Sequence, residues 1–311
     1  MEDMNTDENK IDSTVIDNPL TEPPKIEEEV INTDTVEEKT PIDTTIEVLS
    51  PEEAKKIEVS DEDSEENEKQ NHTLRVSSLY KSFGHKKVVR GIEFSMKMGE
   101  VLGLLGPNGA GKTTTFYMVV GFYKPTAGDV FLDDKCLTDL PMFKRARLGI
   151  AYLPQEPSVF RKFTVEENIW SILETRRDLT TKEKKEKLES LIEEFSIGRI
   201  RKQKAFTLSG GERRRTEIAR SLAMEPKFLL LDEPFAGIDP IAVADIKHMV
   251  RLLAKRGIGI LITDHNVRDT LEITDRAIIV NQGTIITQGT KEDILSSEEA
   301  REIYLGKDFS M

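Results

Sequence analysis

The chain has 311 residues, a formal net charge of −13 at pH 7 and a single cysteine, Cys136. This length allows one large or two medium domains, and one cysteine excludes an internal disulfide and favours a reducing compartment, where we expect a small buried thiol. Residues 1–10 are acidic and polar, unlike a signal peptide, and no apolar run approaches the roughly 18 residues that span a bilayer. We therefore expect a cytoplasmic protein that meets a membrane only through a partner.

The negative charge is concentrated at the start of the chain. Residues 1–72 hold 24 acidic and 6 basic side chains and no aromatic residue, whereas the remainder holds 33 acidic and 38 basic side chains. Such a segment cannot bury enough apolar surface to offset the entropy of ordering it. We predict a disordered acidic extension over residues 1–72 and a folded domain over residues 73–311.

Apolar patterns then predict strands that alternate with helices. The expected strands cover residues 74–79, 88–96, 101–105, 128–132, 148–153, 228–231, 259–263 and 277–280. Strands that alternate with helices favour an α/β fold with a mostly parallel sheet. The first two strands precede this alternation.

Between these strands the pattern becomes helical, from residue 155 to about residue 225. Thr180 and Glu183 have the spacing of a capping box, and Leu188, Leu191 and Ile192 form one apolar helix face. The charged run 182–187 is then the solvated side of that helix. We predict a helical insertion in the sheet domain.

A glycine-rich loop follows the strand 101–105. Its residues, Gly106-Pro107-Asn108-Gly109-Ala110-Gly111-Lys112-Thr113, fit G-x-x-x-x-G-K-[ST], the phosphate-binding loop in its required setting. The glycines let backbone N–H groups converge on phosphate oxygens, and the next helix points its positive end at them. Lys112 adds a charge for the outer phosphates, and Thr113 offers a hydroxyl to Mg²⁺.

A second chemical signal is the strand 228–231, which ends in Asp232 and Glu233. Buried acids need a partner that compensates their desolvation. A bound Mg²⁺ and an attacking water are such partners, so we expect Asp232 to hold the metal and Glu233 to orient or deprotonate the water. Capping of the next helix is the alternative explanation for these two carboxylates.

Between the two motifs lies Leu208-Ser209-Gly210-Gly211-Glu212, another glycine-rich turn that opens a helix. With the phosphate loop before it and the two carboxylates after it, this sequence resembles the signature of ABC-type ATPases. The resemblance implies a P-loop NTPase fold, the ABC nucleotide-binding domain, with an antiparallel N-terminal β subdomain beside the mostly parallel core sheet and an inserted α-helical subdomain. It also implies ATP and Mg²⁺ as ligands, and ATP hydrolysis. ATP would contact the loop residues 106–113 and Thr114.

Further positions match this family one by one. Tyr80 resembles the aromatic residue that stacks on adenine, with packing of an edge strand as its alternative role. Gln155 resembles the glutamine that links Mg²⁺ and the attacking water to the helical insertion. Asp239 falls in the loop that reaches the other subunit, and His265 resembles the switch histidine at the γ-phosphate. The catalytic set is then Glu233, His265 and Gln155, and the metal set is Thr113, Gln155 and Asp232.

The resemblance also implies a homodimer. In ABC dimers the signature of one subunit closes on the ATP held by the phosphate loop of the other, so residues 208–212 would act on the partner's nucleotide.

From about Leu74 onward the chain resembles one branch of this family, the ATPases of bacterial lipopolysaccharide export. The narrower matches are the strings Thr115-Phe116-Tyr117-Met118, Pro234-Phe235-Ala236-Gly237 and Asp264-His265-Asn266-Val267-Arg268, and the ending Tyr304-Leu305-Gly306 with Phe309. ATPases of branched-chain amino-acid importers have similar motifs and are the alternative. A soluble ABC protein acting on ribosomes or DNA is disfavoured because only one phosphate loop is present and the extension is acidic.

This resemblance implies partners. Two copies would sit on the cytoplasmic face of the inner membrane under two transmembrane permease subunits of the LptF/LptG kind and extract lipopolysaccharide. We expect the permease subunits to dock near residues 155–162, with Phe160 as an apolar anchor or, alternatively, as a core residue, and we expect no nucleic acid partner.

Overall fold

The computed structural model describes residues 72–306, and its larger sheet has six strands in the order β10-β9-β3-β8-β7-β6. These strands are β3 (Val101–Leu105), β6 (Ile150–Leu153), β7 (Phe228–Asp232), β8 (Gly259–Thr263), β9 (Arg276–Asn281) and β10 (Thr284–Gly289). All neighbours pair in parallel except β9 and β10. The predicted mostly parallel sheet is therefore confirmed, and the antiparallel edge strand β10 is an addition to it.

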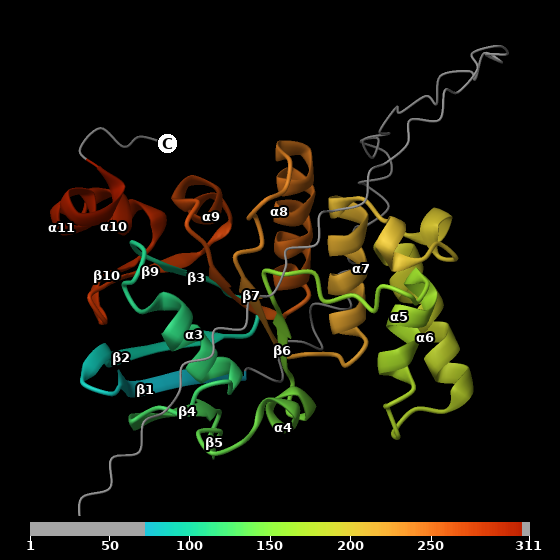
Figure 1. Cartoon of the computed structure of the whole chain (residues 1–311), viewed down its shortest axis with the longest axis horizontal. Helices are drawn as coiled ribbons and strands as arrows, with labels where there is room; N and C mark the ends of the chain where they lie inside the picture. Colours follow the sequence, from blue (N-terminus) through green and yellow to red (C-terminus); the bar gives the residue numbers. More distant parts are fainter. Residues whose placement is uncertain (1–71, 307–311) are drawn as a thin grey trace, which may run out of the picture. The chain divides into compact units, whose positions relative to one another are not determined.

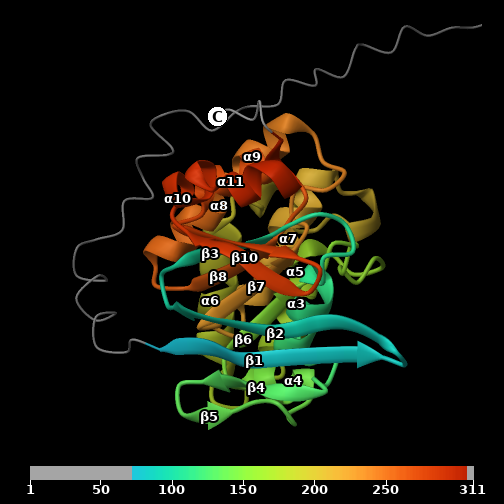
Figure 2. The same ribbon diagram turned by 90° about the vertical axis from the view of Figure 1, so that its left-hand side faces the viewer.

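A second, antiparallel sheet has the order β2-β1-β4-β5. Its strands are β1 (Thr73–Phe83), β2 (Lys86–Lys97), β4 (Ala127–Leu132) and β5 (Lys135–Cys136). In Figure 2, β1 and β2 run side by side across the front of the domain. The prediction that Cys136 is buried is wrong, because this thiol lies on the two-residue edge strand β5 and is exposed.

Helix α3 (Lys112–Val120) packs between the two sheets. Phe116 and Met118 of this helix are buried in one cluster with Leu74 of β1 and Leu104 of β3. Because side chains of a strand alternate between its two faces, Phe228 and Leu230 of β7 join this cluster, whereas Leu229 and Leu231 join the cluster on the other face. Both faces of the central strands are buried, as continuous apolar strands predict.

Helices cover the other face of the large sheet. Of these, α7 (Gly210–Leu222) and α8 (Pro240–Lys255) contact its strands, while α5 (Val165–Leu173) and α6 (Thr181–Glu194) pack against α7. The predicted capping box at Thr180 and Glu183 is present, and Leu188, Leu191 and Ile192 are buried. Figure 1 shows α5 and α6 on the side of α7 that lies away from β1 and β2, which is the placement expected of an insertion.

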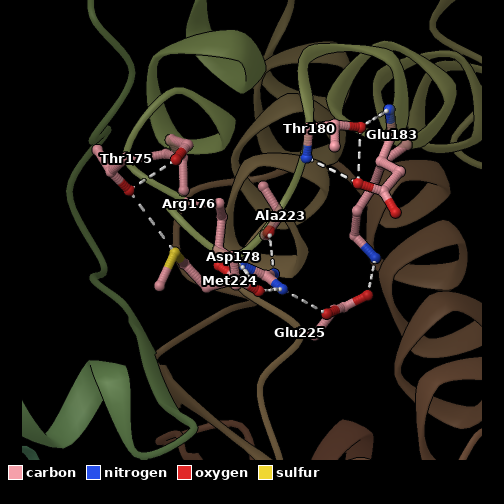
Figure 3. A network of polar contacts seen from close by, with 10 residues as sticks. Thr175, Arg176, Asp178, Thr180, Glu183, Ala223, Met224 and Glu225 are labelled. Carbon is pink, nitrogen blue, oxygen red and sulfur yellow. Dashed lines mark hydrogen bonds and ion pairs between the residues drawn. The ribbon is translucent and has the colours of Figure 1, made fainter.

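Arg176 fastens this helical insertion to the end of α7. Its guanidinium binds Asp178, the Ala223 carbonyl and Glu225, which also accepts a hydrogen bond from Lys187 (Figure 3). These contacts join the loop after α5 to the connection between α7 and β7. The Arg176 guanidinium lowers the pKa of Asp178 from its ordinary value of 3.8 to about 2.

The remaining elements are shorter. They are α4 (Met142–Arg147), α9 (Val267–Ile273), α10 (Lys291–Ser296), α11 (Glu298–Ala300), the 3₁₀ turns η1 (Gly198–Ile200) and η2 (Ala205–Thr207), and a π-helical turn η3 (Arg301–Leu305). None of the helices within residues 72–306 is long and apolar enough to cross a membrane. The predicted acidic extension and Phe309 lie outside the described residues, apart from His72.

Candidate functional site

The phosphate-binding loop connects β3 to α3 at the edge formed by the carboxyl ends of the parallel strands. Gly106, Gly109 and Gly111 all have positive φ, at 144°, 77° and 106°. A Cβ on Gly106 would lie 2.0 Å from the Val280 carbonyl oxygen, so no other residue fits there. The chain has glycine where the backbone turns back on itself and where a neighbouring strand approaches it closely.

Lys112 is buried in this loop. Its Nζ donates to the carbonyl oxygens of Gly106, at 2.6 Å, and Pro107, at 3.0 Å. Burial lowers the pKa of Lys112, while the nearby carboxylates of Glu233 and Asp264 act in the opposite direction. The loop therefore holds a cation whose only hydrogen-bond partners among residues 72–306 are two neutral carbonyls, and a phosphate would be a stronger partner.

A cavity of about 400 Å³ opens over this loop. Asn108, Gly109, Ala110, Gly111, Lys112, Thr113 and Thr114 line it, together with Glu233 and Gln282. The β1–β2 hairpin adds Lys86, Lys87 and Arg90, which sequence analysis did not select. The three basic residues among the first five positions of β2 were a signal for them, because a strand that presents three cations beside a phosphate loop strengthens an anion site.

Tyr80, the residue expected to stack on adenine, does not line this cavity. Its side chain is 46% exposed, and its hydroxyl lies against Gly91 of β2. Phe83, three residues later, is 45% exposed and pairs with Lys86 across the hairpin. Two exposed aromatic residues of β1 therefore pair with β2 residues that line the phosphate-loop cavity, Arg90 and Lys86, and sequence analysis considered only one.

Asp232 and Glu233 lie where β7 ends, beside the end of β8. Asp232 is buried, and its Oδ1 accepts a hydrogen bond of 2.8 Å from the Thr263 hydroxyl. Glu233 has φ 43°, and its backbone N–H donates to the Thr263 carbonyl at 2.7 Å. This unusual backbone turns the Glu233 carboxylate toward the loop cavity, which it lines.

Two further predicted residues meet Glu233. The Gln155 side-chain amide donates to Glu233 Oε2 at 2.8 Å, and His265 Nδ1 lies 3.6 Å from the same oxygen. His265 and Gln155 are exposed and Glu233 is half-buried, so all three side chains are accessible to solvent. The structure thus brings together the three residues expected to be catalytic, which come from three different connections of the sheet.

Asp264 is a buried acid that sequence analysis noted only as part of a string. It accepts hydrogen bonds from the backbone N–H groups of Phe235 and Asn266, at 3.2 and 2.8 Å. Burial raises the pKa of Asp264 in spite of these bonds. It therefore ties the loop after β7 to the loop that carries His265.

The signature residues lie apart from the phosphate-loop cavity. Ser209 and Glu212 form a capping box at the start of α7, while Ser209 and Gly210 are exposed. Gly210 lines a different cavity of about 440 Å³ with Gln155, Glu233 and Asp239. None of residues 208–212 lines the phosphate-loop cavity within the described part of the chain, and only Glu233 borders both cavities.

Asp239 is the N-cap of α8. Its Oδ1 accepts a hydrogen bond of 2.9 Å from the backbone N–H of Ala242, while the residue itself is exposed. An acid suits this position because one carboxylate oxygen caps the helix. The other carboxylate oxygen remains available to a second molecule.

Phe160 is on the surface, so it is not a core residue, and its role as an apolar anchor stays a prediction. Its ring is 47% exposed and lines a groove of about 310 Å³. The groove walls include Val120, Met142, Ala146, Arg220 and Met224. Buried Asn168 holds the Phe160 backbone through both its N–H and its carbonyl, and Arg220 holds the backbone and side chain of Ser158. These hydrogen bonds fix the backbone of the segment 156–162 at Ser158 and Phe160.

A phosphate loop, a helical insertion that follows Gln155 and a second glycine turn in front of β7 occur here in the order that defines an ATP-binding cassette. The family model for ABC transporters matches residues 89–236. The lipopolysaccharide export system ATP-binding protein LptB of Haemophilus influenzae is 52% identical over 238 residues, which cover 76% of this chain and 99% of that protein. LptB of Escherichia coli K12 is 50% identical over 77% of this chain and 99% of its own length.

Other relatives carry less specific names. A probable ABC transporter ATP-binding protein of Azorhizobium caulinodans is 54% identical over 77% of this chain and 85% of its own length. Among solved structures, the ADP conformation of MJ1267, an ATP-binding cassette of an ABC transporter, has a TM-score of 0.68 at 30% identity and covers 76% of this chain and 99% of its own. The chain belongs to the family of ABC transporter ATP-binding proteins.

Membership makes the chain an ATP-binding and ATP-hydrolysing enzyme. It also implies that the chain dimerises and works with permease subunits in a membrane.

Proposed function

We propose that the chain is the ATPase subunit of a transporter that exports lipopolysaccharide from the inner membrane, and that it binds the cytoplasmic face of that membrane through its partners. The observation that carries this proposal is the identity of 50–52% to proteins named for lipopolysaccharide export, over 98–99% of their length. The motifs that ATPases of branched-chain amino-acid importers share with this chain do not favour the importer over lipopolysaccharide export.

ATP would bind with its phosphates over the amides of the phosphate loop. Burial of Lys112 supports this role, because its ammonium is already held at the loop and needs only a short movement to contact a phosphate. The hairpin cations Lys86, Lys87 and Arg90 would add attraction for the same negative charge.

The residues expected to hold Mg²⁺ fit this ion. Thr113 offers a hydroxyl, Asp232 a carboxylate and Gln155 an amide oxygen, since its amide nitrogen is engaged with Glu233. All three are hard oxygen donors, and few protein ligands are expected where phosphates supply the rest. Within residues 72–306 no group of three or more His, Cys, Asp or Glu side chains could hold a metal alone. When bound, the ion would neutralise charge on the phosphates.

Glu233 would orient the attacking water. One of its oxygens accepts from Gln155, which fixes the carboxylate and leaves the other oxygen for a water proton. His265 lies on the same side and would donate to the γ-phosphate. Because both groups are solvent-accessible here, we infer that a second molecule must cover them before water is positioned.

A second copy of the chain would provide that cover. The signature turn is exposed and does not line the phosphate-loop cavity of its own chain, which supports action on the ATP of a partner. In this arrangement Ser209, Gly210 and Gly211 face the other subunit's phosphates, and Asp239 reaches across the interface.

The groove beside Phe160 would receive the permease subunits, of the LptF/LptG kind. Its walls are mostly apolar, and the segment 156–162 at its rim carries the exposed Phe160 ring on a backbone that Asn168 and Arg220 hold by hydrogen bonds. A rigid apolar rim suits an amphipathic helix from a partner.

Affinity capture from detergent-solubilised membranes tests the function. The wild-type chain should retain two membrane subunits that also bind lipopolysaccharide, and Phe160→Ala should lose them without losing ATP binding. Capture of a permease with a periplasmic amino-acid-binding protein would overturn the export proposal.

A further inference from the structure

Arg145 is the largest side chain that the fold buries almost completely. It is on α4, is 1% exposed and belongs to none of the catalytic or nucleotide-binding positions. Burial lowers its pKa to about 10, so the guanidinium remains charged at neutral pH. A buried cation normally has a carboxylate partner, because isolated charges are costly to desolvate.

No carboxylate pairs with Arg145 in the part of the chain that the structure describes. Its four hydrogen bonds all go to main-chain carbonyls: Leu140 at 2.9 Å, Thr138 at 3.1 Å, Met118 at 2.8 Å and Val119 at 2.7 Å. The planar guanidinium is therefore used as a fork that joins two segments.

Met118 and Val119 belong to the last turn of α3, the helix that begins at the phosphate loop. The last four carbonyls of a helix have no partner within it, and the negative end of the helix dipole favours a cation there. Gly121, the C-cap at φ 98°, lets the guanidinium approach, because a Cβ at this position would lie 2.8 Å from Arg145 Nε. Arg145 thus supplies both the missing donors and the charge.

The other end of this connection is the groove beside Phe160. Met142 and Ala146, on either side of Arg145 in α4, line that groove, and so does Val120 at the end of α3. The short helix α4 therefore lines the groove proposed for the permease. Through Arg145 it is also hydrogen-bonded to α3, the helix that begins at the phosphate loop.

We propose that Arg145 is a positioning residue that couples the groove to the nucleotide site by holding the C-terminal end of α3 to α4. A partner in the groove moves α4, and the carbonyl fork transfers this movement to the loop at the other end of α3. Coupling is reciprocal, so a nucleotide phosphate at the loop also alters α4. The partner in this statement rests on the proposed function, whereas the coupling itself can be measured without it.

Amide hydrogen exchange of the full chain, with and without ADP and Mg²⁺, tests the coupling. In the wild type, ADP should slow exchange in the phosphate loop and also severalfold in residues 142–149. In Arg145→Met the loop should remain protected, while the response of residues 142–149 should fall below about a third of its wild-type size. Arg145→Lys, which keeps the charge but not the fork, should be intermediate.

Two controls separate coupling from loss of stability. Arg147→Ala removes an exposed charge from the same helix, and Leu137→Ala opens a cavity in the adjoining core; both should keep the response of residues 142–149 to ADP. Gly121→Ala disrupts the same contact from the α3 side, because its Cβ would collide with the Arg145 guanidinium. If Arg145→Met does not fold, Gly121→Ala is used in its place.

The proposal is overturned if ADP leaves exchange in residues 142–149 unchanged in the wild type, or if the response persists in Arg145→Met or Gly121→Ala. A chain that captures no permease would refute the proposed docking partner but not this result, because the exchange measurement needs only ADP.

Discussion

Gln155 and Glu233, 78 residues apart in the sequence, are joined by a hydrogen bond of 2.8 Å from the glutamine amide to the glutamate carboxylate. Gln155 follows β6 and opens the connection to the helical insertion, whereas Glu233 follows β7 and faces the phosphate loop. A movement of the insertion would therefore displace the Glu233 carboxylate, which is expected to orient water. In the proposed function, this contact would link a membrane partner at the insertion to ATP hydrolysis.

Glu233→Gln should remove ATP turnover while leaving ATP binding intact. A glutamine can still meet Gln155 but cannot take a proton from water, and general bases contribute about 10²–10⁴-fold to rates. We expect phosphate release to fall by at least about 100-fold, with unchanged affinity for a fluorescent ATP analogue. Turnover close to that of the wild type would show that Glu233 is not the base.

Gly106→Ala should be far more harmful than Gly109→Ala. Both residues have positive φ, but only at Gly106 would the new Cβ collide with a carbonyl, whereas Gly109 has open space around it. We expect Gly106→Ala to lower the free energy of unfolding by about 2–4 kcal/mol and Gly109→Ala by about 1 kcal/mol. Urea denaturation measures both, and equal losses would mean that the close contact with Val280 does not constrain the loop.

The adenine-stacking residue can be assigned by comparing Tyr80→Ala with Phe83→Ala. If Tyr80 stacks on adenine, its truncation should weaken ATP binding by about 5–150-fold, the effect of losing about 1–3 kcal/mol of base stacking. Phe83→Ala is then the matched control, since both rings are similarly exposed on β1. The reverse result would move the assignment to Phe83.

Local patterns predicted much of this fold from the sequence. The capping box of Thr180 and Glu183 and the continuous apolar strand of β7 depend on neighbours in the chain, and both were recognised. The phosphate loop and the signature turn were found for the same reason.

Features that depend on distant partners were not predicted. Arg145 looks like one of several exposed cations of α4, and only the approach of the α3 carbonyls explains its burial. Cys136 was expected to be buried because small thiols usually are, but its strand lies at a sheet edge. Tyr80 was chosen by its resemblance to a position of the family, and its role in stacking on adenine stays a prediction.

Low pH should weaken the ion pairs of Arg176 with Asp178 and Glu225, which join the helical insertion to the end of α7. The pKa of Asp178 is lowered to about 2 in the folded chain, so its contribution to stability is present above its ordinary value of 3.8 and is lost as the pH falls toward 2. The pKa of Glu225 is also lowered, by Lys187 and Arg176 against the effect of burial, and acts in the same direction.

Thermal unfolding at several pH values measures this effect. The difference in Tm between the wild type and Arg176→Met should be constant from about pH 7 to pH 5 and should shrink between about pH 4 and pH 2. Lys182→Ala, which breaks an exposed pair with Glu186, should show no such trend. A wild-type advantage that persists at pH 2 would exclude these ion pairs as its source.

We propose that two copies of the chain complete each other's ATP site, because the exposed signature turn does not line the phosphate-loop cavity of its own chain. Sedimentation of the Glu233→Gln chain with ATP and Mg²⁺ tests it most directly. We predict a stable dimer with two ATP molecules, which reverts to monomer when Ser209→Arg is added. A chain that remains monomeric with ATP bound would contradict the account.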